Sequence, residues 1–156
     1  MDNIIIFVDG ACANNQCKEN IGGWGAVIQN QSRVREIYGG EINTTNQRME
    51  LKACIEALNA INNSKIPIEL YSDSAYLINC MNDKWYKKWL NNGWKNSKKQ
   101  PVENKDLWEE ILDLIKIYDI NFIKVKGHIG IELNERADDL AQKGIEELRK
   151  GLNKNV

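Results

Sequence analysis

Four carboxylates lie far apart along the chain, at places where a folded sheet could bring them together: Asp9, Glu50, Asp73 and Asp138. The only histidine, His128, comes shortly before the last of them. Oxygen ligands gathered from separate segments suit hard divalent cations such as Mg²⁺, and two such ions can hydrolyse a phosphodiester without a covalent intermediate. The residue types therefore favour a metal-dependent nuclease.

Two of these carboxylates follow apolar segments that are typical of buried strands. Ile4–Val8 is rich in β-branched residues and comes directly before Asp9. Ile68–Tyr71 is separated from Asp73 by one residue, Ser72. Ligand sites in open α/β sheets gather at the carboxyl ends of strands, so we expect Asp9 at a strand end near Asp73, with the other two carboxylates on helices over that edge. Four carboxylates so placed would repel one another unless cations neutralised them.

The remaining elements follow from apolar periodicity. Gly23–Gln29 and Arg33–Ile42, separated by a polar turn, predict an antiparallel hairpin that forms a three-stranded meander with the first strand. Helical spacing begins at Thr45, with Thr44 or Thr45 as the candidate N-cap, and recurs over 74–81, 104–118 and 134–149, with a last strand over 121–126. The order βββαβααβα predicts an α/β fold with a mixed sheet covered by helices.

The length of 156 residues fits a single domain over 1–150 with a short tail over 151–156. The N-terminus has no basic region before its short apolar run, so we expect no signal peptide or membrane anchor. The spacing of the four cysteines fits neither a redox pair nor a zinc site, which favours free thiols in a reducing cytoplasm.

Basic charge is concentrated in one segment although the formal net charge is −1. Lys84–Lys99 holds six lysines and no acid, and it interleaves Lys87 and Lys88 with Trp85, Trp89 and Trp94. Lysines neutralise phosphates, and indoles offer flat apolar surface to sugars and bases. An alternative interpretation makes Trp85 and Trp89, four residues apart, ordinary core contacts of an amphipathic helix, which would leave the lysines unexplained.

Four sequence segments, in this order, together resemble the motifs of type 1 ribonuclease H: Phe7-Val-Asp-Gly10, Thr44-Thr-Asn-Gln-Arg-Met-Glu-Leu51, Tyr71-Ser-Asp-Ser74, and Val125-Lys-Gly-His128 followed by Asn134-Glu-Arg-Ala-Asp-Asp-Leu-Ala141. The resemblance covers about Ile4 to Leu148. It implies a five-stranded sheet with three antiparallel strands and two strands parallel to the first. It also implies hydrolysis of the RNA strand of RNA–DNA hybrids with two Mg²⁺ ions, or Mn²⁺ as a substitute, without sequence specificity and leaving 3′-hydroxyl and 5′-phosphate ends.

The resemblance also implies roles for the candidate catalytic residues. Asp9 would bridge the two ions, Asp138 would complete the site on the nucleophile side, and Glu50 and Asp73 the site on the leaving-group side. His128 would assist proton transfer or product release, and the alternative is a surface histidine without a role. Helix geometry favours Asp138 over its neighbour Asp139, because Asn134 and Asp138 are four residues apart and share a face. A single histidine excludes a mechanism in which two imidazoles activate the ribose 2′-hydroxyl.

Substrate contacts are implied in the same way. Asn15, Asn46 and Gln47 resemble the family's minor-groove contacts, Thr45 its DNA-phosphate contact, and Asn134 a further substrate-binding position. Asn and Thr commonly cap helices or form turns, which is the alternative for each, and the polar loop leaves the choice between Asn14 and Asn15 open. The lysine-rich segment resembles the family's basic handle, which grips the DNA strand.

Three other interpretations compete with this one. The sheet could belong to an integrase or junction resolvase, although those lack this combination of handle, histidine loop and Asn-Gln-Arg-Met-Glu segment. A hybrid-binding module without activity should lack at least one of the four carboxylates. A retroviral-type domain of a polymerase is the third. We expect a free-standing monomer that binds RNA–DNA hybrid, has no obligate protein partner and acts in the cytoplasm.

Overall fold

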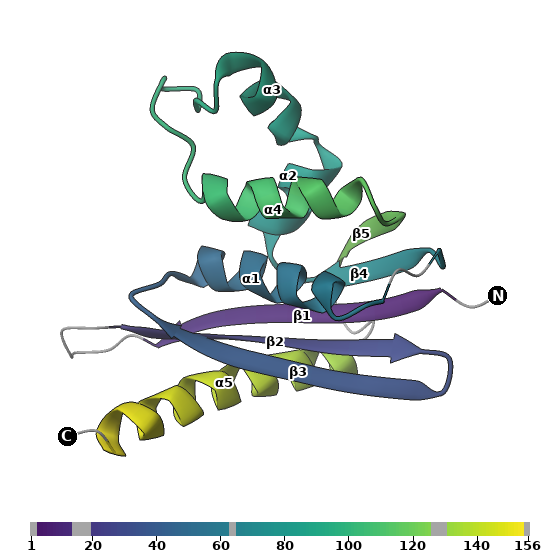
Figure 1. The fold of residues 1–156 in the computed structure, drawn as a ribbon, viewed down its shortest axis with the longest axis vertical. Helices are drawn as coiled ribbons and strands as arrows, with labels where there is room; N and C mark the ends of the chain where they lie inside the picture. The colour runs from purple at the N-terminus through teal and green to yellow at the C-terminus, as the bar shows by residue number, and fades with distance from the viewer. Residues whose placement is uncertain (1–2, 14–19, 63–64, 126–130, 155–156) are drawn as a thin grey trace.

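The computed structural model describes residues 3–13, 20–62, 65–125 and 131–154. These residues form a five-stranded sheet in the order β3-β2-β1-β4-β5 (Figure 1). The first three strands pair antiparallel, and β4 and β5 run parallel to β1, so the predicted mixed sheet is confirmed. The strands are β1 (Ile4–Ala13), β2 (Ile21–Asn30), β3 (Arg33–Ile42), β4 (Ile68–Ser72) and β5 (Ile120–Lys124).

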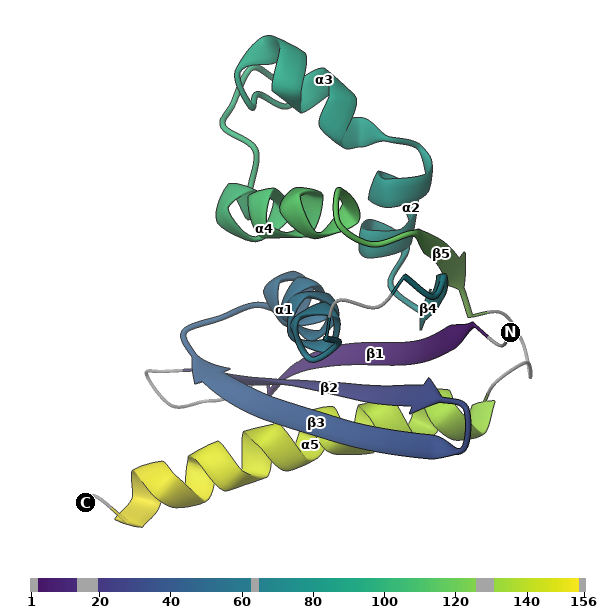
Figure 2. The same ribbon diagram turned by 45° about the vertical axis from the view of Figure 1, so that its right-hand side comes forward.

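Helices cover both faces of the sheet. They are α1 (Asn46–Asn59), α2 (Ala75–Asn82), α3 (Trp85–Asn92), α4 (Lys105–Ile115) and α5 (Ile131–Lys154). In both ribbon views α1 lies on one face with α4 beyond it, α5 lies on the opposite face, and α3 is farthest from the sheet (Figures 1 and 2). None of the described helices combines the length and the apolar character needed to cross a bilayer.

The central strand β1 is buried on both faces, as its apolar sequence predicted. Ile4, Ile6 and Val8 pack into the core that includes Leu51 of α1. Phe7, on the opposite face, belongs to a second cluster that includes Leu140 of α5. Because side chains alternate along a strand, Asp9 shares the α5 face of the sheet with Phe7. The pleat therefore directs the first candidate carboxylate toward the helix that carries Asp138.

The expectation that Asp9 ends its strand is wrong. β1 continues to Ala13, and Asp9 pairs with Gly25 of β2. The parallel pairing with β4 nevertheless stops at Phe7 and Tyr71, so Asp9 lies just beyond the carboxyl end of the parallel ladder. The small residues that follow Asp9 pair with the glycine-rich start of β2, which continues the strand.

Two helical regions also differ from the predictions. The predicted order has two helices between the last two strands, but α3 adds a third. No side chain caps the start of α3, where Lys84 has a left-handed backbone conformation, so the usual N-terminal signal is missing from the sequence. The end of the helix has a common stop signal, because Gly93 adopts the left-handed conformation there. The last helix begins before Asn134 and continues through Lys154, which makes most of the expected tail helical.

Helix α5 approaches the sheet closely at Gly144. A Cβ atom at this position would collide with the backbone of Gly39 in β3. Glycine therefore has a packing reason here, despite its low helix propensity. This contact seats α5 firmly on the sheet and so fixes the helix that presents Asp138.

The described cysteines Cys12, Cys54 and Cys80 are free thiols, as the sequence predicted. Cys54 and Cys80 are buried, and burial raises the pKa of each thiol to about 12. Neither is therefore a reactive thiolate at neutral pH.

Candidate active site

Three carboxylates from different elements converge beyond the end of the parallel ladder. Asp9 comes from β1, Glu50 from the second turn of α1, and Asp73 from the residue after β4. One oxygen of each lies within 4.8 Å of the others. Asp9 is buried, Glu50 is half-buried and Asp73 is exposed, so the group opens to solvent on one side.

Glu50 reaches this group because α1 passes directly over Gly10. A Cβ at Gly10 would collide with the backbone of Met49 and Glu50, so only glycine allows this approach beside Asp9. The helix start is fixed by Thr45, whose hydroxyl accepts the Arg48 backbone N–H at 3.1 Å. The Asp-Gly pair of the first motif thus places one carboxylate and makes room for the next.

Two serines hold Asp73 between β4 and α2. The buried Ser72 hydroxyl accepts the backbone N–H of Ser74 at 3.0 Å, and the Ser74 hydroxyl accepts the N–H of Leu77 at 3.1 Å, capping α2. These local bonds fix the strand-to-helix turn. The side chain of Ser74 also hydrogen-bonds Glu50 and so connects the two carboxylate-bearing turns.

Burial and mutual repulsion make the group costly to ionise. Burial, then the charges of Asp73 and Glu50, raise the pKa of Asp9 to about 8. Burial and the Asp73 charge raise the pKa of Glu50 to about 7, against the opposing hydrogen bond from Ser74. Shifts of this kind and clustering are typical of sites that exchange protons for cations.

The fourth carboxylate lies beside Asp9 but outside the group of three. The Asp138 side chain is near enough to Asp9 to raise the pKa of that carboxyl further, after burial and the charges of Asp73 and Glu50. Asp9 therefore stands between Asp138 on one side and Glu50 with Asp73 on the other. The structure thus groups Asp9, Glu50 and Asp73, and it places Asp138 near Asp9.

The donor set suits a divalent cation. The Glu50 Oε2 atom is buried and has no hydrogen-bond partner among the described residues. The same holds for the buried Oδ1 atom of Asn134, one turn before Asp138. Buried polar atoms normally have partners, so an unpartnered carboxylate oxygen in this group fits a site that takes a cation. Asp9, Glu50, Asp73 and Asp138 could hold hard cations, with Asn134 at the edge.

The predicted substrate contacts on α1 lie at its exposed start. Asn46 and Gln47 are exposed in the first turn, and Thr45 acts as the N-cap, which was the alternative interpretation for that residue. Asn15 and His128 lie outside the described residues.

The basic handle, residues Lys84–Lys99, contains α3. Lys87 and Lys88 are exposed on this helix, and Trp85 is 37% exposed. Trp89 and Trp94 are half-buried and stack on each other, with ring centroids 5.6 Å apart. The packing alternative, made for Trp85 and Trp89, thus holds for Trp89 and is wrong for Trp85. Trp94 also packs against the core, whereas Trp85 and the lysines remain available at the surface.

Sequence reasoning missed the residue that holds the segment leading into α1. The Asn20 side chain donates to the Thr44 carbonyl and accepts the Thr44 N–H, both at 2.9 Å. This pairing fixes the chain directly before Thr45, Asn46 and Gln47. Its two members are 24 residues apart, so no local pattern announces it.

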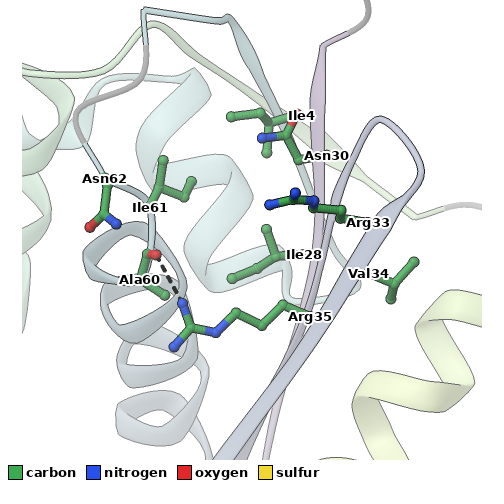
Figure 3. A pocket seen from close by; sticks show the side chains of 9 residues that line it. All are labelled: Ile4, Ile28, Asn30, Arg33, Val34, Arg35, Ala60, Ile61 and Asn62. Atoms are coloured by element: carbon green, nitrogen blue, oxygen red, sulfur yellow. Dashed lines mark hydrogen bonds between the residues drawn. The ribbon is translucent and has the colours of Figure 1, made fainter.

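A separate hollow of about 590 Å³ lies at the other end of β1. Figure 3 shows Ile4, Ile28 and Ile61 in it together with Arg33 and Arg35, and the Arg35 guanidinium donates to the carbonyl of Ala60 at the end of α1. The lining contains no carboxylate and is not part of the acidic group. The cation-binding chemistry of the described residues is therefore concentrated at the Asp9 end.

The fold and the acidic group define an α/β protein with a candidate divalent-cation site beside its central strand. The sequence matches the family described as RNase H over residues 1–146, so the chain belongs to the ribonuclease H family. It is 50% identical to the ribonuclease H of Syntrophomonas wolfei over 148 residues, covering 95% of this chain and 99% of that protein. It is 49% identical to the ribonuclease H of Chlorobaculum parvum over 144 residues, covering 92% and 96%.

Solved structures agree with this assignment. The structure of LC9-RNase H1, described as a type 1 RNase H with the type 2 active-site motif, superposes with a TM-score of 0.78 at 26% identity. The alignment covers 94% of this chain and 74% of that one. The family resemblance predicted from four short motifs is thereby confirmed.

Proposed function

We propose that this protein is an endoribonuclease that hydrolyses the RNA strand of RNA–DNA hybrids, with divalent cations held by Asp9, Glu50, Asp73 and Asp138. The observation that carries the proposal is the convergence of Asp9, Glu50 and Asp73, one oxygen of each lying within 4.8 Å of the others, together with the buried and unpartnered Glu50 Oε2. Membership of the ribonuclease H family supports the choice of substrate and reaction.

The four carboxylates fall into two sets that share Asp9. Asp9 with Asp138 forms one candidate cation site, and Asp9 with Glu50 and Asp73 forms the other. Divalent cations held there would lower the pKa of a water so that it can act as the nucleophile, and would neutralise the charge that develops on the phosphate and the departing oxygen. Water oxygen then bonds to phosphorus as the bond to the 3′ oxygen breaks, which leaves 3′-hydroxyl and 5′-phosphate ends. Mg²⁺ is the proposed ion, with Mn²⁺ as a substitute.

The residues of this chain set the geometry of that reaction. The Gly10 approach and the Ser72–Ser74 turn fix Glu50 and Asp73, so each oxygen is placed before a cation arrives. Asn134 orients substrate at the edge of the site. His128 is proposed to carry the proton to the departing group or to assist product release, and its loss should slow turnover without abolishing it.

Substrate discrimination is assigned to the start of α1 and to the handle. Asn15, Asn46 and Gln47 contact the minor groove, where amide groups can hydrogen-bond the 2′-hydroxyls that distinguish RNA from DNA. Thr45, Lys87 and Lys88 contact DNA phosphates. Trp85 offers a sugar contact, and the packed pair Trp89 and Trp94 supports the handle. Contacts to phosphates and sugars carry no base information, so cleavage is independent of sequence.

Cleavage assays test the proposal directly. Labelled RNA–DNA hybrid, RNA duplex and DNA duplex are incubated with Mg²⁺ or EDTA, using the wild type and Asp73→Asn. The expected result is metal-dependent cutting of RNA in the hybrid alone, lost in Asp73→Asn. Binding of hybrid without cutting would instead identify a binding module, and cutting of DNA duplex would point to another nuclease class. We also propose that the enzyme is a monomer that acts in the cytoplasm. Sedimentation measurements can test whether its mass in solution is that of a single chain.

A further inference from the structure

A hydrogen-bonded junction joins the helix that carries Glu50 to the helix that supports the handle. The Arg48 guanidinium, in the first turn of α1, donates to both carboxylate oxygens of Asp106 in α4, at 3.1 and 2.8 Å. It also donates to Asn104 Oδ1 at 3.2 Å. Arg48 belongs to the second sequence motif, yet the acidic site makes no use of it.

The same junction reaches the start of α2. Asn104 donates from Nδ2 to the Tyr76 hydroxyl at 3.1 Å, and the fully buried Trp108 donates from its indole N–H to the same hydroxyl at 2.9 Å. Tyr76 follows Asp73 by three residues. The junction, defined as Arg48, Tyr76, Asn104 and Asp106, therefore ties the α1 and α2 turns that present Glu50 and Asp73 to α4.

Aromatic contacts continue from the junction into the handle. The Trp108 ring lies 5.3 Å from Tyr76 and 5.7 Å from Trp89 of α3, between ring centroids. Trp89 in turn stacks on Trp94. A continuous path of packed side chains thus connects the turns carrying Glu50 and Asp73 with the helix carrying Lys87 and Lys88.

We propose that this junction is a positioning device that sets the distance between the handle and the acidic site. The inference rests on the proposed function, in which the handle grips one strand while the other strand is cut. A nucleic-acid duplex resists bending, so its phosphates meet both surfaces only if their separation is fixed. Arg48, Tyr76, Asn104 and Asp106 act through other groups and are positioning residues.

The ion pair has the geometry of a positioning contact. The side chains of Arg48 and Asp106 are 30% and 64% exposed, so solvent weakens their attraction. The pair is bidentate, which fixes orientation more strictly than a single contact does. Asn104 adds to this order, because its side chain bonds the junction and does not cap α4.

The test compares two aspartates on the same helix. Asp106→Asn breaks the bidentate contact, whereas the control Asp113→Asn removes a charge whose ion-pair partner is the nearby exposed Lys116. Charge alone would strengthen hybrid binding in both variants. The junction instead predicts that Asp106→Asn raises KM for a hybrid by about fivefold with kcat within about twofold, and that Asp113→Asn leaves KM at or below the wild-type value. Equal KM values for the two variants would overturn the proposal.

A second comparison asks whether the effect travels through the handle. In a Lys87→Ala/Lys88→Ala background, Asp106→Asn should add little to the loss of binding, because the grip that it misplaces is already weakened. Fully additive losses would contradict the proposed coupling. Arg48→Lys keeps the charge but loses the fork geometry, so its KM should lie between those of the wild type and Asp106→Asn.

Hybrid binding measured by anisotropy in EDTA separates this proposal from the proposed reaction. A wild type that binds hybrid without cutting it under Mg²⁺ contradicts the reaction, and the binding constants of the same variants then decide the junction. A wild type that cuts hybrid, with Asp106→Asn indistinguishable from Asp113→Asn in binding and KM, overturns the junction alone. We also expect Asp106→Asn to increase the rate of amide hydrogen exchange in α3 and to leave it unchanged in α5.

Discussion

Replacing Asp9 by Asn should stabilise the metal-free protein while abolishing its activity. Asp9 is buried among other carboxylates, and its pKa of about 8 means that the folded state holds a proton which the unfolded state releases near pH 4. The unfolding free energy of the wild type therefore falls as pH rises from about 4 to about 8. Asn has a similar shape and carries no charge, so the variant lacks this loss.

The pKa shift gives the order of magnitude. Each pKa unit corresponds to about 1.4 kcal/mol, so the four-unit rise sets an upper limit of about 5 to 6 kcal/mol. Glu50 also retains its proton until about pH 7, which reduces the repulsion that Asp9 experiences. We therefore expect Asp9→Asn to gain about 2 kcal/mol at pH 8, or roughly 4 to 8 °C in Tm for a protein of this size. The gain should vanish below about pH 4.

Denaturant and thermal unfolding in EDTA, from pH 4 to 8.5, measure this gain. Asp139→Asn is the matched control, because Asp139 is exposed on α5 next to Asp138. Added Mg²⁺ should stabilise the wild type, since a ligand that binds only the folded state raises its stability, and should have little effect on Asp9→Asn. An Asp9→Asn variant that is no more stable than the wild type at pH 8 in EDTA would refute the reasoning.

Three further outcomes are expected. Mg²⁺ binding near pH 7 should release protons, because cations displace them from Asp9 and Glu50. The binding enthalpy measured by calorimetry should therefore depend on the ionisation enthalpy of the buffer, and a binding enthalpy that is the same in every buffer would contradict this. Lys87→Ala should weaken hybrid binding and lower the slope of log K against log salt by about 1, whereas an unchanged slope would remove this lysine from the phosphate contacts. Gly144→Ala should destabilise the fold by about 1 to 3 kcal/mol through collision with β3. Its control Gly151→Ala, on open helix surface, should stabilise by about 0.5 to 1 kcal/mol, and similar effects of both in unfolding experiments would disprove the packing argument.

Local patterns in the sequence were sufficient for the framework of the site. β-branched runs predicted the buried strands, helical periodicity predicted α1 and α5, and the i,i+4 relation of Asn134 and Asp138 selected the carboxylate that lies near Asp9. These inferences succeeded because burial imposes periods of two and 3.6 residues on a chain, whatever the rest of the fold does. The positions of the aspartates relative to these elements followed from the same periods. The positive charge of the handle could be counted directly in the sequence.

Contacts between distant segments were decided only in the tertiary structure. The continuation of β1 past Asp9 depends on the glycine-rich partner strand, and the start of α3 at Lys84 has no capping side chain that could announce it. The pairing of Asn20 with Thr44 and the junction of Arg48 with Asp106 join residues 24 and 58 positions apart. Such bonds leave no periodic trace, since they require only that two side chains meet after folding. The sequence by itself therefore determined which groups could do the chemistry, and the tertiary packing decided how far apart they are held and what holds them there.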